Sequence, residues 1–269
     1  MDLALQGKTA IVTGGASNIG RRISLTLGRE GANVVIVDLD PNQGNKVVQE
    51  IVGAGGKAVC IETDVTSLPA VEAMFKQSVD SFGQVHVLVN NVGWDKVMYF
   101  LETDPALWDK LININYRSNL NTFKTVLPHM IENGYGRIVS IASEAGRIGE
   151  FRESVYSGLK AGVIALSKSI AREVGRHNIT VNTVCPGLTM PEDDSEVSAV
   201  SMWAKGRGEV IDFFPTEVEM AQAAKRFPLR RVGRPQDIAN AVAFLSSDAA
   251  SFITGQALSV SGGYTMIGS

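Results

Sequence analysis

Short apolar runs alternate with longer amphipathic stretches along almost the whole chain. Nearly every position in the runs is apolar, as in strands buried on both faces of a parallel sheet. The runs cover residues 9–13, 33–38, 57–62, 85–89, 136–143, 179–184 and 257–260. Between them, patterns typical of helices extend to residue 31 and cover residues 42–53, 68–82, 104–133, 154–175 and 235–246. We therefore predict an α/β fold, a doubly wound parallel sheet in a single domain.

The predicted helix over residues 154–175 carries an apolar stripe at spacings of three and four. The stripe is expected to face the sheet and consists of Leu159, Val163, Leu166, Ile170 and Val174. By contrast, residues 188–231 form a long irregular segment. Because such segments in compact domains are usually functional or disordered, we expect it to be a substrate lid.

Composition narrows the set of partners. With 25 Lys and Arg against 28 Asp and Glu, the net charge of −3 argues against nucleic acid or an anionic membrane held by bulk charge. The stretch before the first apolar run is too short and polar for a signal peptide, and no run approaches membrane-spanning length. We expect a cytoplasmic protein.

The cysteines and histidines do not indicate a metal site. Cys60 and Cys185 each lie inside an apolar run, which indicates reduced, buried thiols. His86, His129 and His177 are scattered and have no Cys partners at metal-ligand spacing. Neither a disulfide nor a metal is expected.

A glycine-rich turn follows the first predicted strand. The chain continues from Thr13 into Gly14-Gly15-Ala16-Ser17-Asn18-Ile19-Gly20 and then into a helix. This order can cradle a pyrophosphate on backbone N–H groups, although many strand–helix turns carry glycines for geometry alone. Asp38 ends the second strand, where a carboxylate can accept both hydroxyls of an adenosine ribose and would repel a 2′-phosphate. The sequence favours NAD over NADP.

Polar residues also stand at the carboxyl ends of later strands, the edge where open α/β sheets bind ligands. They are Asp64, the turn Asn90-Asn91-Val92-Gly93, and Ser143. Asp64 also fits the cap of the next helix, and the asparagines fit an ordinary turn. Asn115 lies inside the predicted helix over residues 104–133, where asparagine is unfavourable and indicates solvent or a specific purpose.

Tyr156 and Lys160 lie one turn apart on the predicted helix over residues 154–175. A cation beside a phenol favours the phenolate, which could act as a general base nearer neutral pH. Taken alone, such a pair is far more often an ordinary exposed helix pair.

Together, these residues resemble the short-chain dehydrogenase/reductase family over essentially the whole chain. Its Thr-Gly-x-x-x-Gly-x-Gly turn corresponds to residues 13–20, its Asp-Val to Asp64-Val65, and its Asn-Asn-Ala-Gly to residues 90–93. The resemblance implies a single NAD(P)-binding Rossmann domain over residues 1–269, with a lid at about residues 188–231, assembled as a homotetramer.

The resemblance also implies a set of site residues. The family's catalytic Asn, Ser, Tyr and Lys fall on Asn115, Ser143, Tyr156 and Lys160. In the family, Lys lowers the pKa of Tyr and holds the nicotinamide ribose, Tyr exchanges the hydroxyl proton, Ser positions the oxygen, and Asn holds a water of a proton relay. The residues expected to bind NAD are Gly14, Ser17, Asn18, Ile19, Gly20, Asp38, Leu39, Asp64, Val65, Asn91, Gly93, Tyr156, Lys160, Pro186, Gly187 and Thr189.

Three positions depart from the family pattern. Asn18 stands where a glycine is usual, but asparagine is the non-glycine residue that best tolerates a left-handed backbone, so the turn is expected to survive. Val92 replaces an alanine. Pro191 takes the place of a threonine that often contacts the nicotinamide amide, which puts that contact in question.

The expected reaction interconverts a secondary, cyclic alcohol and its ketone by hydride transfer to NAD. The stretches 93–96, 185–187 and 259–263 look most like 2-hydroxycyclohexanecarboxyl-CoA dehydrogenases. A dehydrogenase of a free cyclic or secondary alcohol, a 3-oxoacyl reductase and a catalytically silent NAD-binding regulatory protein are the alternatives.

Two features of the sequence bear on the substrate. The lid carries Trp203, Phe213, Phe214 and Phe227, aromatic residues that could cover a cyclic apolar substrate or pack within the protein. Arg147 and Arg152 could bind an anionic substrate group or a CoA phosphate, or could be ordinary surface arginines.

Overall fold

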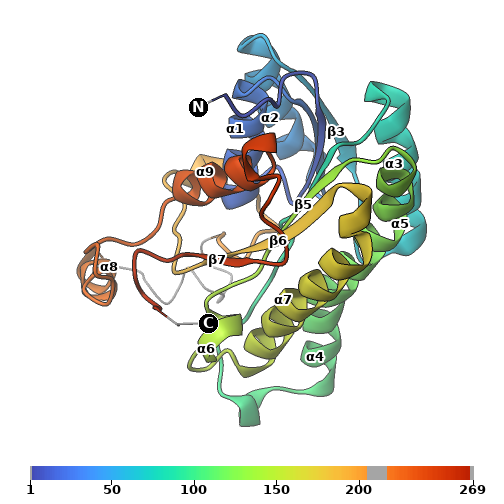
Figure 1. Cartoon of the computed structure of the whole chain (residues 1–269). Helices are drawn as coiled ribbons and strands as arrows, with labels where there is room; N and C mark the ends of the chain where they lie inside the picture. The colour runs from blue at the N-terminus through green and yellow to red at the C-terminus, as the bar shows by residue number, and fades with distance from the viewer. Residues whose placement is uncertain (1, 205–216, 267–269) are drawn as a thin grey trace.

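Seven parallel strands form one sheet in the order β3-β2-β1-β4-β5-β6-β7 (Figure 1). The computed structural model describes residues 2–204 and 217–266. The strands are β1 (Thr9–Thr13), β2 (Asn33–Asp38), β3 (Lys57–Glu62), β4 (Val87–Asn90), β5 (Gly136–Ile141), β6 (Ile179–Pro186) and β7 (Ala257–Val260). The strand order reverses between β1 and β4, the switch point beside which such sheets bind dinucleotides. The predicted doubly wound Rossmann fold is confirmed.

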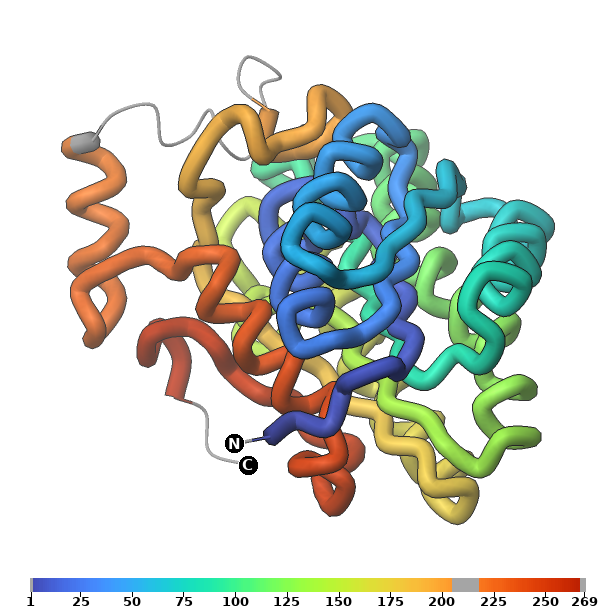
Figure 2. The backbone as a smooth tube through the Cα atoms, turned by 90° about the horizontal axis from the view of Figure 1, so that it is seen from above, coloured from blue at the N-terminus to red at the C-terminus, as the bar shows by residue number. Residues whose placement is uncertain are grey.

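Helices cover both faces of the sheet (Figures 1 and 2). They are α1 (Asn18–Arg29), α2 (Pro41–Gly53), α3 (Leu68–Phe82), α4 (Pro105–Ile112), α5 (Ser118–Glu132), α6 (Ala145–Ile148), α7 (Ser154–Val174), α8 (Glu217–Ala224) and α9 (Pro235–Leu245). Because successive strand residues point to opposite faces, Val12 packs with α1, α2 and α9, whereas Ile11 packs with α3, α5 and α7. This two-sided burial explains the continuous apolar runs.

The helix predicted over residues 104–133 is interrupted. A π-helical segment, Asn113–Arg117, separates α4 from α5. From the start of α5, the Ser118 hydroxyl donates to the Ile114 carbonyl of this segment at 2.6 Å, and the Asn119 amide donates to the Asn115 carbonyl at 3.0 Å. These side chains satisfy carbonyls that the wider turn takes out of the α-helical pattern. The interruption is stabilised by local polar side chains that an apolar periodicity does not reveal.

The apolar stripe on α7 is confirmed only in part. Val163, Ile170 and Val174 are buried, but Leu159 and Leu166 are half-buried. Similarly, Cys185 is buried, whereas Cys60 on the edge strand β3 is half-buried, contrary to expectation. Both thiols are free, and burial raises the pKa of each to about 11.

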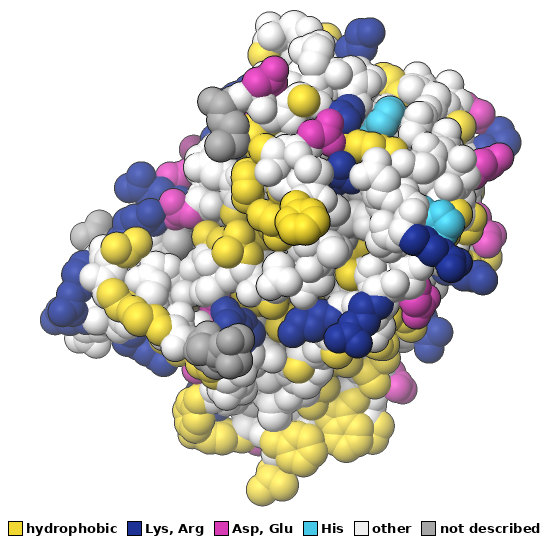
Figure 3. Space-filling view, viewed as in Figure 1, with side chains coloured by type: hydrophobic (Ala, Val, Ile, Leu, Met, Phe, Trp, Pro, Cys, Tyr) yellow, Lys and Arg dark blue, Asp and Glu magenta, His cyan; other side chains and the backbone are white. Residues whose placement is uncertain are grey.

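Exposed hydrophobic side chains gather at the end of the molecule where α4 and α6 lie (Figure 3). Phe100 is 53% exposed, Leu101 94% and Phe151 70%. Helix α8 stands away from the strands in both views, at the left edge of Figures 1 and 2. The lid predicted over residues 188–231 therefore includes a helix, and its residues 205–216 lie outside the described part of the chain.

Candidate active site

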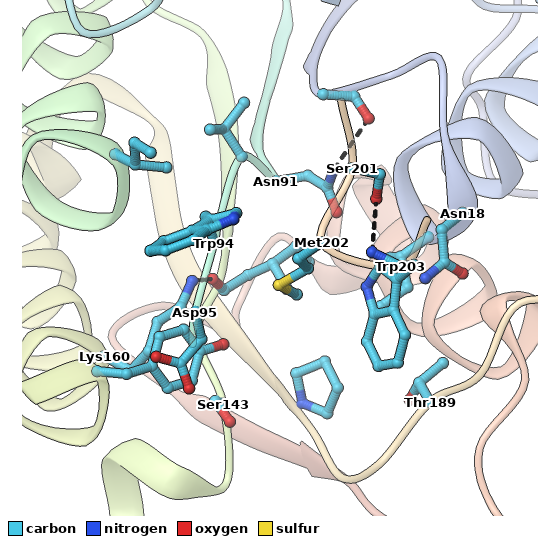
Figure 4. A pocket seen from close by; sticks show the side chains of 18 of the residues that line it. Asn18, Asn91, Trp94, Asp95, Ser143, Lys160, Thr189, Ser201, Met202 and Trp203 are labelled. Carbon is cyan, nitrogen blue, oxygen red and sulfur yellow. Dashed lines mark hydrogen bonds between the residues drawn. The ribbon is translucent and has the colours of Figure 1, made fainter. Parts of the chain in front are cut away.

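A single cavity of about 920 Å³ lies along the carboxyl ends of the strands and brings the predicted site residues together (Figure 4). Of the predicted residues, the following line it: Gly14, Ser17, Asn18, Ile19, Gly20, Asp38, Leu39, Asp64, Val65, Asn91, Gly93, Ser143, Tyr156, Lys160, Pro186, Gly187 and Thr189. Pro191 and Asn115 are not among the lining residues.

The glycine-rich turn at one end of the cavity depends on two glycines. Gly14 adopts a φ of 62°, which favours glycine. A Cβ atom on Gly20 would collide with the Gly14 carbonyl oxygen, so the start of α1 can approach the turn only without a side chain. Asn91 fixes this arrangement from β4, because its side-chain amide donates to the carbonyls of Thr13 at 3.1 Å and Gly14 at 3.2 Å.

Asn18 lies in this turn at the N-terminus of α1. Its φ of 46° confirms that asparagine adopts the left-handed backbone here. The side chain is 5% exposed, and neither its amide nitrogen nor its oxygen has a hydrogen-bond partner in the described structure. An unpartnered amide beside the free N–H groups of a helix start is suited to a phosphate oxygen. The turn therefore fits a pyrophosphate.

Asp38 lies at the end of β2, at the adenosine side of this turn. Its carboxylate accepts hydrogen bonds from the N–H groups of Ala16 at 3.0 Å and Asp40 at 3.2 Å. Burial raises its pKa, and these N–H donors oppose the shift. A carboxylate has further acceptor capacity for ribose hydroxyls, so the geometry fits an unphosphorylated ribose. Asp64 instead binds its own turn, accepting from the N–H of Thr66 at 2.9 Å, while still lining the cavity.

The segment after β6 folds back over the part of the cavity that Ser17 and Asp38 line. The Ser198 N–H donates to the Ser17 hydroxyl at 3.0 Å, and the Ser198 hydroxyl donates to Asp40 at 2.7 Å. Glu196 forms an ion pair with Arg21 at 2.9 Å. These contacts hold the first part of the predicted lid against α1 and α2.

Two of the four lid aromatics line the cavity. Trp203 lies near Asn18 and Thr189, and Phe227 is buried and stacks on Tyr264 with ring centroids 5.2 Å apart (Figure 4). Phe213 and Phe214 lie outside the described residues.

Ser143, Tyr156 and Lys160 meet at the other side of the cavity from Asn18. Lys160 is 2% exposed; its Nζ donates to the Ile141 carbonyl at 2.9 Å and lies 5.5 Å from the centre of the Tyr156 ring. Ser143 follows β5 and accepts from the N–H of Ala145 at 3.1 Å. Burial lowers the pKa of Lys160 to about 8. A phenol, a hydroxyl and an amine therefore face one space, which suits proton exchange with a substrate oxygen.

The expected lowering of the Tyr156 pKa by Lys160 is not seen in the unliganded chain. Burial raises this pKa, and the carboxylates of Glu153 and Asp95 raise it further, while the Ser143 hydroxyl opposes the shift. The phenol is thus held protonated. The helix spacing indicated the neighbouring cation but not the two neighbouring acids.

Asn115 lies beneath the cavity. Its side chain is fully buried; its oxygen accepts from the Trp94 N–H at 3.2 Å, and its nitrogen donates to the Trp94 carbonyl at 2.8 Å. The oxygen also lies close to Gly93. Through these bonds, the π-helical segment fixes the turn that carries residues 93–95.

Asp95 and Glu153 are the acidic residues that the sequence analysis missed. Asp95 follows the Asn90–Gly93 turn by two residues, and Glu153 precedes Tyr156 by three, so both stand beside recognised motifs. Their positions beside these motifs were a usable signal, whereas the burial of Asp95 and the place of both side chains in the cavity were visible only in the structure.

The two arginines of the β5–α7 connection differ. Arg152 lines the cavity, and its guanidinium lies 4.8 Å from the centre of the Tyr99 ring. Arg147 does not line it and pairs with Glu144 at 3.5 Å. Nearby, the Tyr264 hydroxyl donates to Glu150 at 2.6 Å, which ties the C-terminal tail to this connection. Of these two arginines, only Arg152 is placed to meet a ligand in the cavity.

Within residues 2–204 and 217–266, no three His, Cys, Asp or Glu side chains are grouped so that they could hold a metal ion. None of the helices in the described ranges combines the length and apolar character needed to span a bilayer.

Known proteins resemble this chain along nearly its full length. Residues 14–265 match a family model described as enoyl-(acyl carrier protein) reductase. The (2S)-(R)-hydroxy(phenyl)methylsuccinyl-CoA dehydrogenase subunit BbsD of Thauera aromatica is 36% identical over 98% of this chain and 99% of its own. The 3-oxoacyl-(acyl-carrier-protein) reductases FabG of Staphylococcus aureus and Thermotoga maritima are 35% and 31% identical, over 96% and 97% of this chain and 98% and 99% of theirs.

Proposed function

This chain belongs to the short-chain dehydrogenase/reductase family, and from that premise we propose that it is an NAD-dependent enzyme that interconverts a secondary alcohol and its ketone. The observation that carries the proposal is the convergence of Ser143, Tyr156 and Lys160 with the glycine-rich turn in one cavity.

Each residue has a distinct role in this proposal. Tyr156 exchanges the hydroxyl proton of the substrate, and Ser143 holds the substrate oxygen. Lys160 holds the nicotinamide ribose, and Asn115 acts as a positioning residue through the Trp94 backbone. When bound, NAD⁺ would supply the hydride acceptor. The protonated phenol of the unliganded chain is the form required to donate a proton to a ketone.

The choice of NAD rests on Asp38. Its buried carboxylate offers acceptors to the ribose hydroxyls and repels a 2′-phosphate. The glycine-rich turn, with the unpartnered Asn18 amide, would hold the pyrophosphate. The lid over residues 188–231 and a homotetrameric assembly belong to the same proposal, and sedimentation of the purified chain would test the assembly.

The proposed substrate is a cyclic alcohol carried as a hydroxyacyl-CoA, such as 2-hydroxycyclohexanecarboxyl-CoA. The cavity offers apolar walls from Trp94, Phe151, Trp203 and Phe227, and a cation from Arg152. The relative from Thauera aromatica is named for a hydroxylated acyl-CoA. A free cyclic alcohol is the second candidate, and the FabG names favour a 3-oxoacyl reductase as the third.

A direct assay tests the proposal. The purified chain is incubated with NAD⁺ or NADP⁺ and a panel of secondary alcohols and hydroxyacyl-CoA esters, and the reduced nicotinamide is followed by absorbance. We expect NADH from at least one cyclic alcohol and much slower NADPH formation. Reduction of neither cofactor with any alcohol, together with NAD⁺ binding, would favour a silent NAD-binding protein.

Replacing Asn18 with glycine should change NAD⁺ affinity by no more than several-fold. Glycine adopts the same positive φ without strain, so the turn persists and only the amide contact is lost. Calorimetric titration of NAD⁺ into wild type and Asn18→Gly measures the effect. Loss of binding would mean that the asparagine amide, and not the turn, dominates pyrophosphate binding.

Replacing Arg152 with alanine should raise the KM of a CoA ester by roughly ten-fold or more, because a charge-assisted hydrogen bond to phosphate or carboxylate is lost. The KM of a free cyclic alcohol should change little. Arg147→Ala is the matched control, since Arg147 lies in the same connection but does not line the cavity. Equal effects of Arg152→Ala on both substrates would count against a CoA ester.

A further inference from the structure

Two acidic side chains flank Tyr156 and have no role in the mechanism above. Asp95 comes from the turn after β4, and Glu153 is the residue that precedes the first turn of α7. Both line the cavity, and the charge of each raises the pKa of Tyr156. In Figure 4, Asp95 lies on the same side of the cavity as Lys160 and Ser143, across from Asn18. The pair therefore borders the space where the reacting carbon would lie.

Neither carboxyl is fully satisfied by the protein, although the backbone N–H of Lys96 stabilises the Asp95 carboxylate. Asp95 is 3% exposed, and its buried Oδ2 has no hydrogen-bond partner in the described structure. The Glu153 carboxyl makes no hydrogen bond or ion pair with any residue that the structure describes. The nearby acids differ, because Glu150 accepts from the Tyr264 hydroxyl and Glu144 pairs with Arg147. An unsatisfied buried carboxyl that lines a cavity indicates a ligand group.

Asp95 is buried and Glu153 is half-buried, and two poorly solvated carboxyls that share one site cannot both ionise without a large cost. Burial raises the pKa of Asp95 to about 7. Burial first, and then the charges of Asp95 and Glu150, raise the pKa of Glu153 to about 8. Lys160 faces Asp95 and only partly opposes its shift. At neutral pH, the pair therefore retains a proton.

The remaining charged groups around the cavity lie on other elements. Lys110 on α4 lies 3.4 Å from the centre of the Trp94 ring, and Arg226 lies 3.9 Å from a Glu150 oxygen. Arg152 lies over the Tyr99 ring. None of these three cations is among the causes of the pKa shifts of Asp95 and Glu153.

We infer that Asp95 and Glu153 form an acid pair that donates a hydrogen bond to a carbonyl oxygen of the substrate, next to the carbinol held by Ser143 and Tyr156. The inference rests on the proposed function and names its substrate class as β-hydroxycarbonyl compounds, esters or thioesters. Ser143 and Tyr156 already serve the reacting oxygen, so a second donor serves a second acceptor. The pair keeps its proton, and no further proton transfer is required.

Three alcohols that share one ring test the inference. They are cyclohexanol, methyl 2-hydroxycyclohexanecarboxylate and 2-aminocyclohexanol, each assayed with NAD⁺. The wild type should prefer the ester over cyclohexanol in kcat/KM by on the order of ten-fold, as one hydrogen bond permits. Glu153→Leu should abolish this preference. Because the variant also removes a charge that raises the pKa of Tyr156, the ratio of ester to cyclohexanol is compared at the pH optimum of each enzyme. Glu153→Gln, whose amide still donates, should retain most of it.

The pH dependence of the KM for the ester provides an independent test. Because the folded pKa of Glu153 is raised to about 8, the donor is present below that pH and lost as the pH rises through it. The KM of the ester should rise above pH 8 in the wild type, whereas that of cyclohexanol should not. Glu153→Gln should remove the rise. An infrared band of protonated carboxyl at pH 7 that is weaker in Glu153→Gln than in the wild type reports the proton without any turnover.

The outcomes separate the inference from the proposed function. Tyr156-dependent oxidation of cyclohexanol tests the function, whereas the ratio of ester to cyclohexanol tests the acid pair. Equal responses of both substrates to Glu153→Leu, or an infrared band no weaker in Glu153→Gln than in the wild type, would overturn the pair. A preference for 2-aminocyclohexanol that is lost in the same variants would show a cation site and would also overturn it.

Discussion

Tyr156→Phe should lower kcat for alcohol oxidation by on the order of 10²- to 10⁴-fold, the usual contribution of a positioned acid or base. The substitution removes the phenol oxygen and leaves the ring in place. Lys160 keeps its bond to the Ile141 carbonyl, so the wall of the cofactor site should persist. NAD⁺ affinity should therefore stay within several-fold. Initial rates of NADH formation and calorimetric titration of NAD⁺ measure the two quantities.

Tyr116→Phe is the matched control. Tyr116 lies in the π-helical segment, packs near Gly162 and does not line the cavity. Loss of its hydroxyl should leave kcat unchanged. If Tyr156→Phe retained most of the activity, the proton would have to be exchanged by another group, and the proposed role of Tyr156 would be wrong.

Gly20→Ala should lower the free energy of unfolding by about 1–3 kcal/mol, the usual range for an overpacked interior position. The added Cβ meets the backbone carbonyl of Gly14 and the Asn91 amide, so the turn and the start of α1 must separate. Because the same turn would cradle the pyrophosphate, NAD⁺ affinity should fall by about ten-fold or more. Thermal unfolding and calorimetric titration of NAD⁺ measure both effects.

Gly53→Ala controls for the general effect of adding a methyl group to a helical glycine. No atom lies within 4 Å of a Cβ at Gly53, and alanine is favoured over glycine in helices by up to ~1 kcal/mol. This variant should be at least as stable as the wild type. Normal stability and NAD⁺ binding in Gly20→Ala would show that α1 can shift at little cost.

The fold was predictable because most of its strands are buried on both faces. Every residue of β1 and β5 is buried, so each strand has consecutive apolar residues at its centre. The interruption between α4 and α5 was not predictable by the same means. It depends on bonds from Ser118 and Asn119 to nearby carbonyls and from Asn115 to Trp94, a residue distant in the sequence.

The site was predictable where motifs mark strand ends and not where burial sets the chemistry. The glycine-rich turn, Asp38, Ser143, Tyr156 and Lys160 were found because each has a fixed place relative to a strand or helix. The protonation of Tyr156 was not, since it depends on how deeply Asp95 and Glu153 lie. Proximity in the sequence indicates contact, but desolvation is a property of the folded chain.

The π-helical segment has a consequence for the angular phase of the chain. A π turn holds about one residue more than an α turn, so it rotates everything that follows by about 100° about the helix axis. As a result, α4 can lie against α7 while α5 turns its apolar side towards α3 and the sheet. One continuous helix would present a single stripe to both neighbours. The extra residue therefore rotates α5, which builds the core, relative to the preceding part of the chain, which supports the active-site turn.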